Sequence, residues 1–397
     1  MGAGLRRCVS LGASGVISPG GSQDYASNSG YMKETGTRWT RFWADWPSLQ
    51  PESNLRPDQG SGSARLKALD RQIAAANADG VSVILTVWRF PRWANGTASL
   101  TATADAGYQL WDRISKGADP AGRKALEFKL PGDLSANSAY GKFLDFLIAR
   151  YNSGNRSRPG TVAALEVCNE PNLQVWPQQG PSTTADPYGS GAITVQQPIA
   201  AMFTTARTVN VRYGSRMLLM GPGTADRTGN SRTATDYATA TKNLLSELTR
   251  TGFKATASFA WSHHNYTDVE YDQGAGSSLG RTTNRAAAVR QMLVGVWPGW
   301  PSGSAANPGL ALTEGGARLN KLASVYGITG PSQLLAKQAS VLQSNWNRMY
   351  LGPDGVGVGI LTWYLYFTDV NFDDGLCEVD GTRRPVYSGW RGLPSFA

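Results

Sequence analysis

The fold is decided by a short apolar stretch, TVAALEVCN at residues 161–169, and by the patterns on either side of it. The stretch has the length of a buried strand. Apolar residues recur at helical spacing over residues 138–151 before it, and a second helical pattern covers residues 195–213 after it. This order of helix, strand and helix indicates an α/β architecture, because consecutive parallel strands need helical crossovers.

The same alternation continues outward to both ends of the chain. Strands are expected at residues 7–12, 37–43, 81–87, 161–169, 216–220, 258–264, 308–314 and 357–363, with helices between most of them. Eight such units in 397 residues favour a single (β/α)8 TIM barrel over a doubly wound sheet. No stretch resembles an interdomain linker, so residues 1–397 are predicted to form one domain. The irregular pieces 88–133 and 171–193 each follow a strand and predict long βα loops at the C-terminal face.

Composition narrows the classes of function. Apolar residues make up 41% of the chain and charged residues 17%, which excludes a wholly disordered chain. The net charge is +9, but adjacent basic residues occur only as the isolated pairs Arg6-Arg7, Arg123-Lys124 and Arg383-Arg384, so we expect a diffuse basic surface and no nucleic-acid partner. The 13 Trp and 15 Tyr suit a core plus a cleft in which rings stack on a ligand.

Membrane and cysteine signals are weak. The longest apolar stretch, residues 356–367, is too short to span a membrane. Three cysteines cannot form a disulfide framework, and Cys168 is expected to be a small buried hydrophobe. Whether Cys8 and Cys377 form a disulfide is left open.

Glutamate is scarce, with nine in the chain, and two of the nine directly follow an apolar run. Glu170 ends the fourth expected strand and Glu314 ends the seventh. A carboxylate at the C-terminal end of a barrel strand faces the barrel mouth, where active sites lie. Two such carboxylates are what glycoside hydrolysis needs, one as a proton donor and the other as an ionised nucleophile.

The run LEVCNEPN at residues 165–172 resembles the acid/base strand of clan A glycoside hydrolases, most closely families 5 and 39. The resemblance extends to spaced sites along nearly the whole chain. Trp176 after this run favours family 39 and is expected to contact the substrate. It implies that Arg41 lies beneath the nucleophile, that Asn169 contacts the sugar 2-hydroxyl and that Glu170 is the acid/base. It also implies that His264 and Tyr266 lie near the reacting sugar. Glu314 would be the nucleophile, and Trp363 would be an aromatic platform under the sugar.

Three departures favour the clan over either family. Cys168 stands where family 39 commonly has Trp, and Gly315-Gly316 follows the implied nucleophile where larger residues are frequent. The accessory β-sandwich that many family 39 enzymes carry is also not expected within these residues.

The physical chemistry supports the implied roles. Arg41 would keep Glu314 ionised, and Tyr266 could donate a hydrogen bond to the same carboxylate. Aromatic neighbours and a nearby negative charge would raise the pKa of Glu170 until it can donate a proton near neutrality. Glu166 shares the side of the strand with Glu170, and is expected to be an interior carboxylate paired with an arginine.

Competing motifs are less convincing. Residues 276–280 fit G-x-S-x-G but lack the flanking strand and helix of a nucleophile elbow, so we expect a loop. Residues 369–375 resemble a calcium loop whose glycine comes one place late, and a solvated loop is expected. His263 and His264 point to opposite faces of a strand, so no metal site is expected, and no cofactor is implied.

We therefore expect a secreted, monomeric, retaining glycoside hydrolase whose signal peptide is absent from this chain. Its substrate would be a neutral oligo- or polysaccharide or glycoside with an equatorial β-D or α-L-arabino-type linkage. A carbohydrate-binding pseudo-enzyme on the same fold is the alternative. The sugar, its linkage, endo or exo action and the family within the clan are left open.

Overall fold

A computed structural model of the protein describes residues 5–10, 25–98, 127, 129–173, 196–228, 235–271, 285–300, 308–350, 357–368 and 372–394. Within these residues strands and helices alternate along the chain. Trp176, residues 276–280 and residues 369–371 lie outside the described part, so the predictions for them stay predictions.

The strands close into one parallel barrel in sequence order, which confirms the predicted fold. They are β1 (Arg6–Ser10), β2 (Trp39–Asp45), β3 (Ser82–Trp88), β4 (Ala164–Glu166), β5 (Leu218–Thr224), β6 (Phe259–His264), β7 (Leu310–Glu314) and β8 (Val358–Tyr364). In a barrel of this kind the carboxyl ends of all strands share one rim, and the loops after them carry the function.

The chain divides into two compact units, which are described separately. The first comprises Met1–Phe42, Arg71–Ile84 and Ala255–Ala397, and the second comprises Trp43–Asp70 and Leu85–Lys254. The expectation of a single domain stays a prediction.

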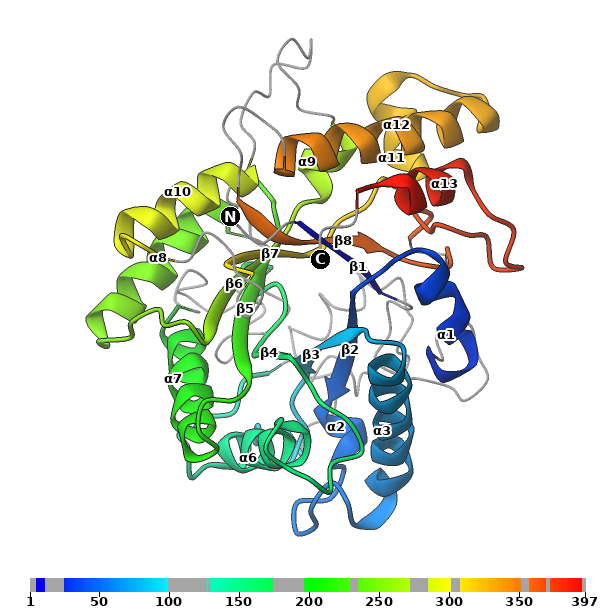
Figure 1. Ribbon diagram of the computed structural model, residues 1–397. Coiled ribbons are helices and arrows are strands. Elements are labelled where there is room, and N and C mark those ends of the chain that lie inside the picture. Colours follow the sequence, from blue (N-terminus) through cyan, green and yellow to red (C-terminus); the bar gives the residue numbers. More distant parts are fainter. Residues whose placement is uncertain are drawn as a thin grey trace. The chain divides into compact units, whose positions relative to one another are not determined.

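The first unit contains β1 and β6 to β8. Its helices are α1 (Tyr25–Glu34), α9 (Tyr266–Glu270), α10 (Arg285–Val296), α11 (Leu319–Tyr326), α12 (Pro331–Tyr350) and α13 (Pro385–Gly392), and α3 (Ser63–Ala78) belongs partly to this unit. The long helix α12 packs against β8 and also contacts α9, α11 and α13 (Figure 1). Trp346 of α12 meets Trp390 of α13 edge to face, with ring centroids 6.4 Å apart. Arg7 of β1 donates to the Trp390 carbonyl at 2.7 Å, which ties the first strand to the last helix.

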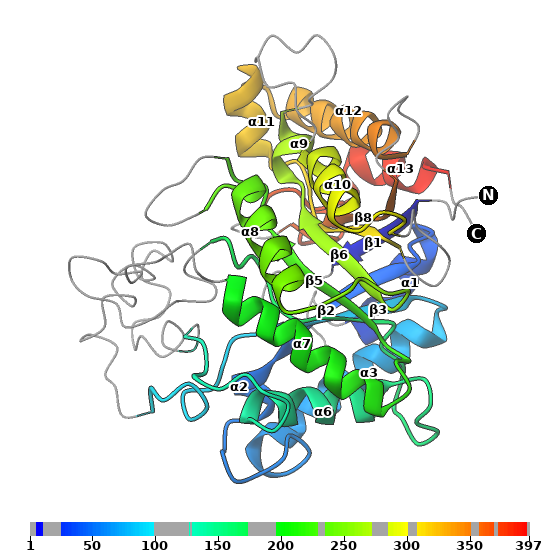
Figure 2. The same cartoon turned by 90° about the vertical axis from the view of Figure 1, so that its left-hand side faces the viewer.

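The second unit contains β4 and β5. Its helices are α2 (Trp46–Leu49), α6 (Ala139–Tyr151), α7 (Gln196–Arg212) and α8 (Tyr237–Arg250), and a 3-10 turn, η1 (Gly60–Gly62), precedes α3. Figure 2 shows α7 and α8 alongside β5. Helix α6 begins at Ala139 because the Ser138 hydroxyl caps it, accepting from the Gly141 amide at 3.1 Å. The buried ring of Trp46 stacks on Phe143 of α6 at 4.8 Å.

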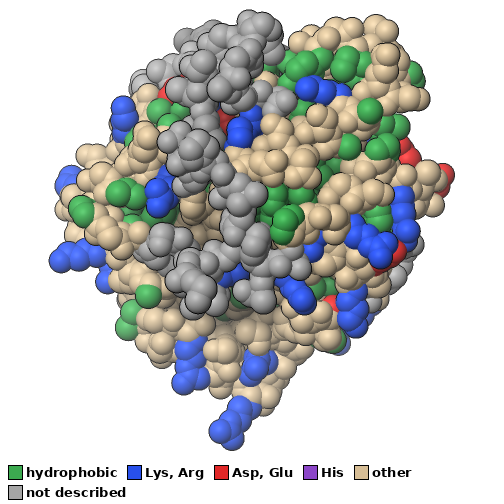
Figure 3. Space-filling view, turned by 45° about the horizontal axis from the view of Figure 1, so that its top comes forward, with side chains coloured by type: hydrophobic (Ala, Val, Ile, Leu, Met, Phe, Trp, Pro, Cys, Tyr) green, Lys and Arg blue, Asp and Glu red, His purple; other side chains and the backbone are tan. Residues whose placement is uncertain are grey.

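The structure also bears on the sequence predictions for the basic surface, for membrane-spanning helices and for the cysteines. Lys and Arg side chains are spread over the face shown in Figure 3, in keeping with a diffuse basic surface. No helix in the described residues has both the length and the apolar character that a membrane crossing requires. Cys8, Cys168 and Cys377 are all buried thiols, so no disulfide joins Cys8 to Cys377. Cys168 is a small buried residue, as predicted, and burial raises the pKa of its thiol.

Candidate active site

The first candidate site surrounds Glu314, the last residue of β7, in the first unit. Glu314 is 5% exposed, and the guanidinium of Arg41 on β2 lies 2.5 Å from its Oε1 atom. Arg41 is itself only 1% exposed. A buried ion pair this close strongly favours the ionised carboxylate, since removing either partner would leave an unpaired charge in the interior.

The other oxygen of Glu314 faces β6 and α9. Tyr266, the first residue of α9, donates its hydroxyl to Oε2 at 3.2 Å, and His264 Nδ1 lies 3.7 Å from the same atom. The barrel register brings these groups together, because His264 pairs with Glu314 and the Asn265 amide donates to the Glu314 carbonyl at 3.0 Å. The structure therefore collects Arg41, His264 and Tyr266 around Glu314, as the sequence resemblance implies.

The arginine beside Glu314 allows a direct test. Lys in place of Arg41 keeps the charge but loses the planar fork, so Arg41→Lys is expected to lower kcat/KM by at least about tenfold. The acidic limb of the pH profile should also move to higher pH, because Glu314 becomes harder to ionise. A pH–rate series measures both effects. An unchanged acidic limb would assign Arg41 a purely structural role.

The two glycines after Glu314 are required by close packing. A Cβ atom on Gly315 would lie 2.1 Å from Asn265 Oδ1, and a Cβ atom on Gly316 would lie 2.2 Å from Asp374 Oδ2. Both distances are far inside van der Waals contact, so a larger residue at either position would force its neighbours to move. At Gly316 these neighbours include the Tyr364 carbonyl oxygen, 2.8 Å away. This explains the departure from the larger residues that the resembling families carry here.

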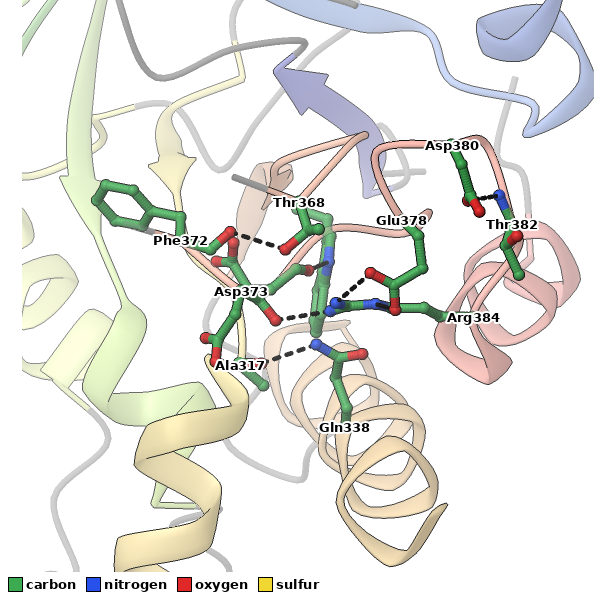
Figure 4. Close-up of polar contacts among 11 residues, drawn as sticks. Ala317, Gln338, Thr368, Phe372, Asp373, Glu378, Asp380, Thr382 and Arg384 are labelled. Carbon is green, nitrogen blue, oxygen red and sulfur yellow. Dashed lines mark hydrogen bonds and ion pairs between the residues drawn. The ribbon is translucent and has the colours of Figure 1, made fainter. Parts of the chain in front are cut away.

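Asp374, which packs against Gly316, is a fully buried aspartate, so the expectation of a solvated loop over residues 369–375 is wrong at this position. It is 0% exposed, and within the described chain neither carboxyl oxygen has a hydrogen-bond partner. The segment that carries it is held by Arg384, which binds the Glu378 carboxylate and the Asp373 carbonyl (Figure 4). Burial raises the pKa of Asp374 well above its usual value against the opposing charge of Arg318, so folding favours the protonated carboxyl.

This buried acid predicts a pH-dependent stability. The folded state binds the Asp374 proton more tightly than the unfolded chain does. The contribution of this proton to the free energy of unfolding is therefore fully present below about pH 3.9, and it declines as the pH rises toward the raised pKa of Asp374. Asp374→Asn removes that decline. The melting temperature of the variant relative to wild type should therefore increase from pH 5 to pH 8 in a thermal-shift series. A difference that stays constant with pH would contradict the assignment.

The second candidate site is the segment after β4, in the second unit. Glu170 is half-buried and has a left-handed backbone with φ of +44°, which is rare for a residue with a long side chain. Its amide donates to the Gly223 carbonyl at 3.0 Å, and its carbonyl accepts from Leu173. Strained backbone of this kind concentrates at functional positions, which supports a role for Glu170.

Asn172 holds this strained segment in place. Its side chain exchanges hydrogen bonds with the Ala225 amide and carbonyl at 2.9 and 2.8 Å, beyond the end of β5, and donates to Thr235. Asn169, the predicted contact to the sugar, is 5% exposed beside Glu170. Asn172 thus has an anchoring role that the sequence motif alone did not reveal.

Glu166 lies four residues before Glu170 and is fully buried at the end of β4. Thr86 of β3 donates its hydroxyl to Glu166 Oε2 at 2.6 Å. The structure confirms an interior carboxylate here, while the arginine partner suggested by the sequence stays a prediction.

Trp363 does not join the residues around Glu314. It is 1% exposed, its indole N–H donates to the Asp374 carbonyl at 2.6 Å, and its ring lies 6.5 Å from Trp390 of α13. This placement leaves almost no ring surface for a sugar. The ring beside Tyr266 is instead that of Tyr364, 6.2 Å away, on the opposite face of β8.

Phe372 completes the aromatic group on the Tyr266 side. Its ring lies 6.1 Å from Tyr266 and 5.3 Å from Tyr364, and it is only partly buried. Of these three rings, Phe372 therefore offers the most surface for stacking on a ligand. Phenylalanine in a loop after a strand carries no periodic signal, which is why sequence reasoning did not single it out.

The second unit also contains a cluster of charged side chains that the sequence analysis did not identify. Arg89 follows β3 with a φ of +57° and binds Asp45, the last residue of β2, through two hydrogen bonds of 2.8 and 2.6 Å. Its remaining terminal nitrogen contacts the carboxylate of Glu127. Asp45 ends a strand and Arg89 directly follows one, and this position is the signal that could have identified them.

Comparison with known proteins gives a result at the level of fold. No protein-family model matches the sequence, and no curated protein matches it. Solved structures do match: a family 39 glycoside hydrolase from the gut symbiont Bacteroides cellulosilyticus WH2 has a TM-score of 0.57 at 14% identity over 98% of this chain. The chain spans 63% of the length of that protein.

Two other solved structures are similar over more of their own length. Endo-glycoceramidase II from Rhodococcus sp. has a TM-score of 0.56 at 15% identity, covering 98% of this chain and 78% of its own. GH5_18 from Streptomyces cattleya, solved in complex with GlcNAc, has a TM-score of 0.56 at 14% identity, covering 100% and 82%. The resemblance to families 39 and 5 drawn from the sequence is thus confirmed at the level of fold.

Proposed function

We propose that this protein is a retaining glycoside hydrolase in which Glu314 is the nucleophile and Glu170 is the acid/base. The single observation that carries the proposal is the buried Glu314 carboxylate, which ends a barrel strand with Arg41 on one oxygen and Tyr266 on the other. Such partners stabilise a carboxylate as an anion and fix its rotamer, which is what a nucleophile requires. Each of the similar structures named above carries a glycosidase name or family label, which supports the same class.

The proposed reaction has two displacements. In the first, a Glu314 oxygen attacks the anomeric carbon, the bond to the leaving oxygen breaks, and Glu170 gives that oxygen its proton. In the second, Glu170 as carboxylate takes a proton from water, the water oxygen attacks the anomeric carbon, and Glu314 leaves as carboxylate. The two carboxyl groups must lie about 5–5.5 Å apart for this mechanism.

The different surroundings of the two glutamates suit this division of labour. Glu314 is almost fully buried against an arginine, whereas Glu170 is half-buried on a strained segment. A general acid/base must exchange protons with water during each cycle, so partial exposure suits Glu170. Asn169 beside it is proposed to contact the sugar 2-hydroxyl, and His264 the sugar near Glu314.

The substrate is proposed to be a neutral oligo- or polysaccharide or glycoside with an equatorial linkage. Partly buried Phe372 offers a ring face for stacking, and neutral sugars are bound by stacking and hydrogen bonds. Secretion of the protein and a monomeric state remain part of the proposal.

The test is a panel of chromogenic β-D-glycosides, α-L-arabinosides and plant and microbial polysaccharides, with anomeric configuration followed by NMR. Turnover with retained configuration supports the proposal, and inversion contradicts the mechanism. Sugar binding without turnover on every substrate would favour the carbohydrate-binding pseudo-enzyme instead.

A further inference from the structure

Tyr266, which donates to Glu314, is itself in contact with an arginine in the same unit. The guanidinium carbon of Arg318 lies 5.1 Å from the centre of the Tyr266 ring. Arg318 stands four residues after Glu314 on the same segment, just before α11. One short stretch of chain thus supplies both the carboxylate that Tyr266 binds and a cation at its ring.

The arginine is held in this position by a second residue of α9. Arg318 donates to Glu270 through Nε at 2.5 Å and through its terminal nitrogen at 2.9 Å. Its backbone amide also points at Glu270, 3.4 Å from Oε1. Tyr266 and Glu270 are four residues apart and so share one face of the helix, with the guanidinium placed against both.

The surroundings keep the guanidinium charged and fixed. Glu270 is 2% exposed, and Gln338 of α12 donates to the carbonyl of neighbouring Ala317 at 2.9 Å, which anchors the segment (Figure 4). Burial by itself lowers the pKa of Arg318, but the hydrogen bonds and charge of Glu270 outweigh it, so the overall shift is upward.

We infer that Arg318 is a positioning residue for the proposed nucleophile, acting through Tyr266. This role rests on the proposed function. A cation at the ring withdraws electron density and makes the phenol a stronger hydrogen-bond donor to Glu314. The contact also fixes the plane of the ring, so the hydroxyl stays aimed at Glu314 Oε2, 3.2 Å away.

Other charged groups also act on the Glu314 carboxylate, and they limit how large the effect of Arg318 on its ionisation can be. Arg41 from β2 and His264 from β6 face Glu314 directly, and Glu170 is the second carboxyl of the proposed pair. Glu270, Asp374 and Lys321 surround Arg318 or its partner. Because Arg318 acts through a ring, its effect should be smaller than that of Arg41.

The test compares Arg318→Gln, which removes the charge, with Arg318→Lys, which retains it. In the pH profile of kcat/KM, Arg318→Gln should move the acidic limb upward by about half a pH unit, and Arg318→Lys by clearly less. In a Tyr266→Phe background, Arg318→Gln should cause no additional movement, because the phenol that carries the effect is gone. Equal loss of kcat in both variants with an unmoved limb would overturn the inference.

Arg150 provides a matched control in the other unit. It also binds a carboxylate through two hydrogen bonds, to Asp70 at 2.9 and 2.5 Å, and its guanidinium carbon lies 5.9 Å from the Tyr151 ring. Its side chain is 26% exposed, as is that of Arg318. Arg150→Gln should lower the melting temperature and leave the acidic limb unmoved, so an equal movement in this control would also overturn the inference.

A second readout separates this inference from the proposed function. With nine glutamates in the chain, selective 13C labelling of their carboxyl groups and assignment through Glu314→Gln follow the titration of Glu314 without turnover. Failure of every substrate would reject the proposed function alone. A Glu314 titration that is the same in wild type and Arg318→Gln would reject the role of Arg318, whatever the activity.

Discussion

Replacing Glu314 by glutamine is expected to lower kcat/KM by at least about 10⁴-fold on every substrate, because it removes the nucleophile of the proposed double displacement. The neutral amide keeps nearly the same volume, its oxygen can still accept from Arg41, and its NH2 group can donate to the hydroxyl oxygen of Tyr266. The fold should therefore survive, and the loss should lie in kcat. Steady-state kinetics with a thermal melt of the same preparation measure both.

Glu247→Gln is the matched control for this change. Glu247 also binds an arginine through two hydrogen bonds, to Arg250 at 2.9 and 2.6 Å, but on helix α8. Its replacement should leave kcat/KM within about twofold, since an ion pair on a helix surface contributes little. Substantial turnover by Glu314→Gln would mean that another group is the nucleophile.

Replacing Glu170 by alanine should have a large effect that depends on the substrate. Natural leaving groups need a proton, so kcat/KM should fall by about 10²–10⁴-fold. An aryl glycoside with an acidic phenol leaves without help, so its first step should be nearly unaffected. Kinetics on a series of aryl leaving groups would show a steep dependence on leaving-group pKa in the variant and a shallow one in wild type.

Azide distinguishes the two proposed roles. In Glu170→Ala it should attack the glycosyl-enzyme and give a glycosyl azide of retained configuration. In Glu314→Ala, where no glycosyl-enzyme forms, azide can only displace the leaving group directly and give the inverted product. The reverse pattern would exchange the roles of the two glutamates.

Most of the barrel could be predicted from the sequence because each strand is a compact apolar run. Strand β7 (Leu310–Glu314) falls within the expected residues 308–314, and β8 (Val358–Tyr364) is displaced by one residue from 357–363. The fourth strand is much shorter than its apolar run, since β4 ends at Glu166 whereas the run continues to residue 169. Beyond β4 the chain turns into the strained backbone of Glu170, and hydrophobicity carries no information on that turn.

The candidate site was predictable only where its residues lie within strands or directly after them. Arg41 and His264 lie in strands, and Tyr266 follows β6. The order of the strands in a barrel therefore predicts that these residues lie near Glu314. Trp363 as an aromatic platform stays a prediction from the resemblance, although its ring packs on the side of Trp390 of α13, because successive residues of a strand face opposite sides. Asp374 and Arg318 come from loops, where position depends on tertiary contacts.

The left-handed backbone of Glu170 has a consequence for how this position can change over evolutionary time. Glycine and asparagine tolerate a φ of +44° far better than glutamate does, so either replacement would relax the segment and make the protein more stable. Random drift under selection for folding alone would therefore move away from glutamate here. Glutamate at such a position is expected only under the opposite pressure, and lineages that abandon the proposed reaction should lose Glu170 early while the barrel around it persists.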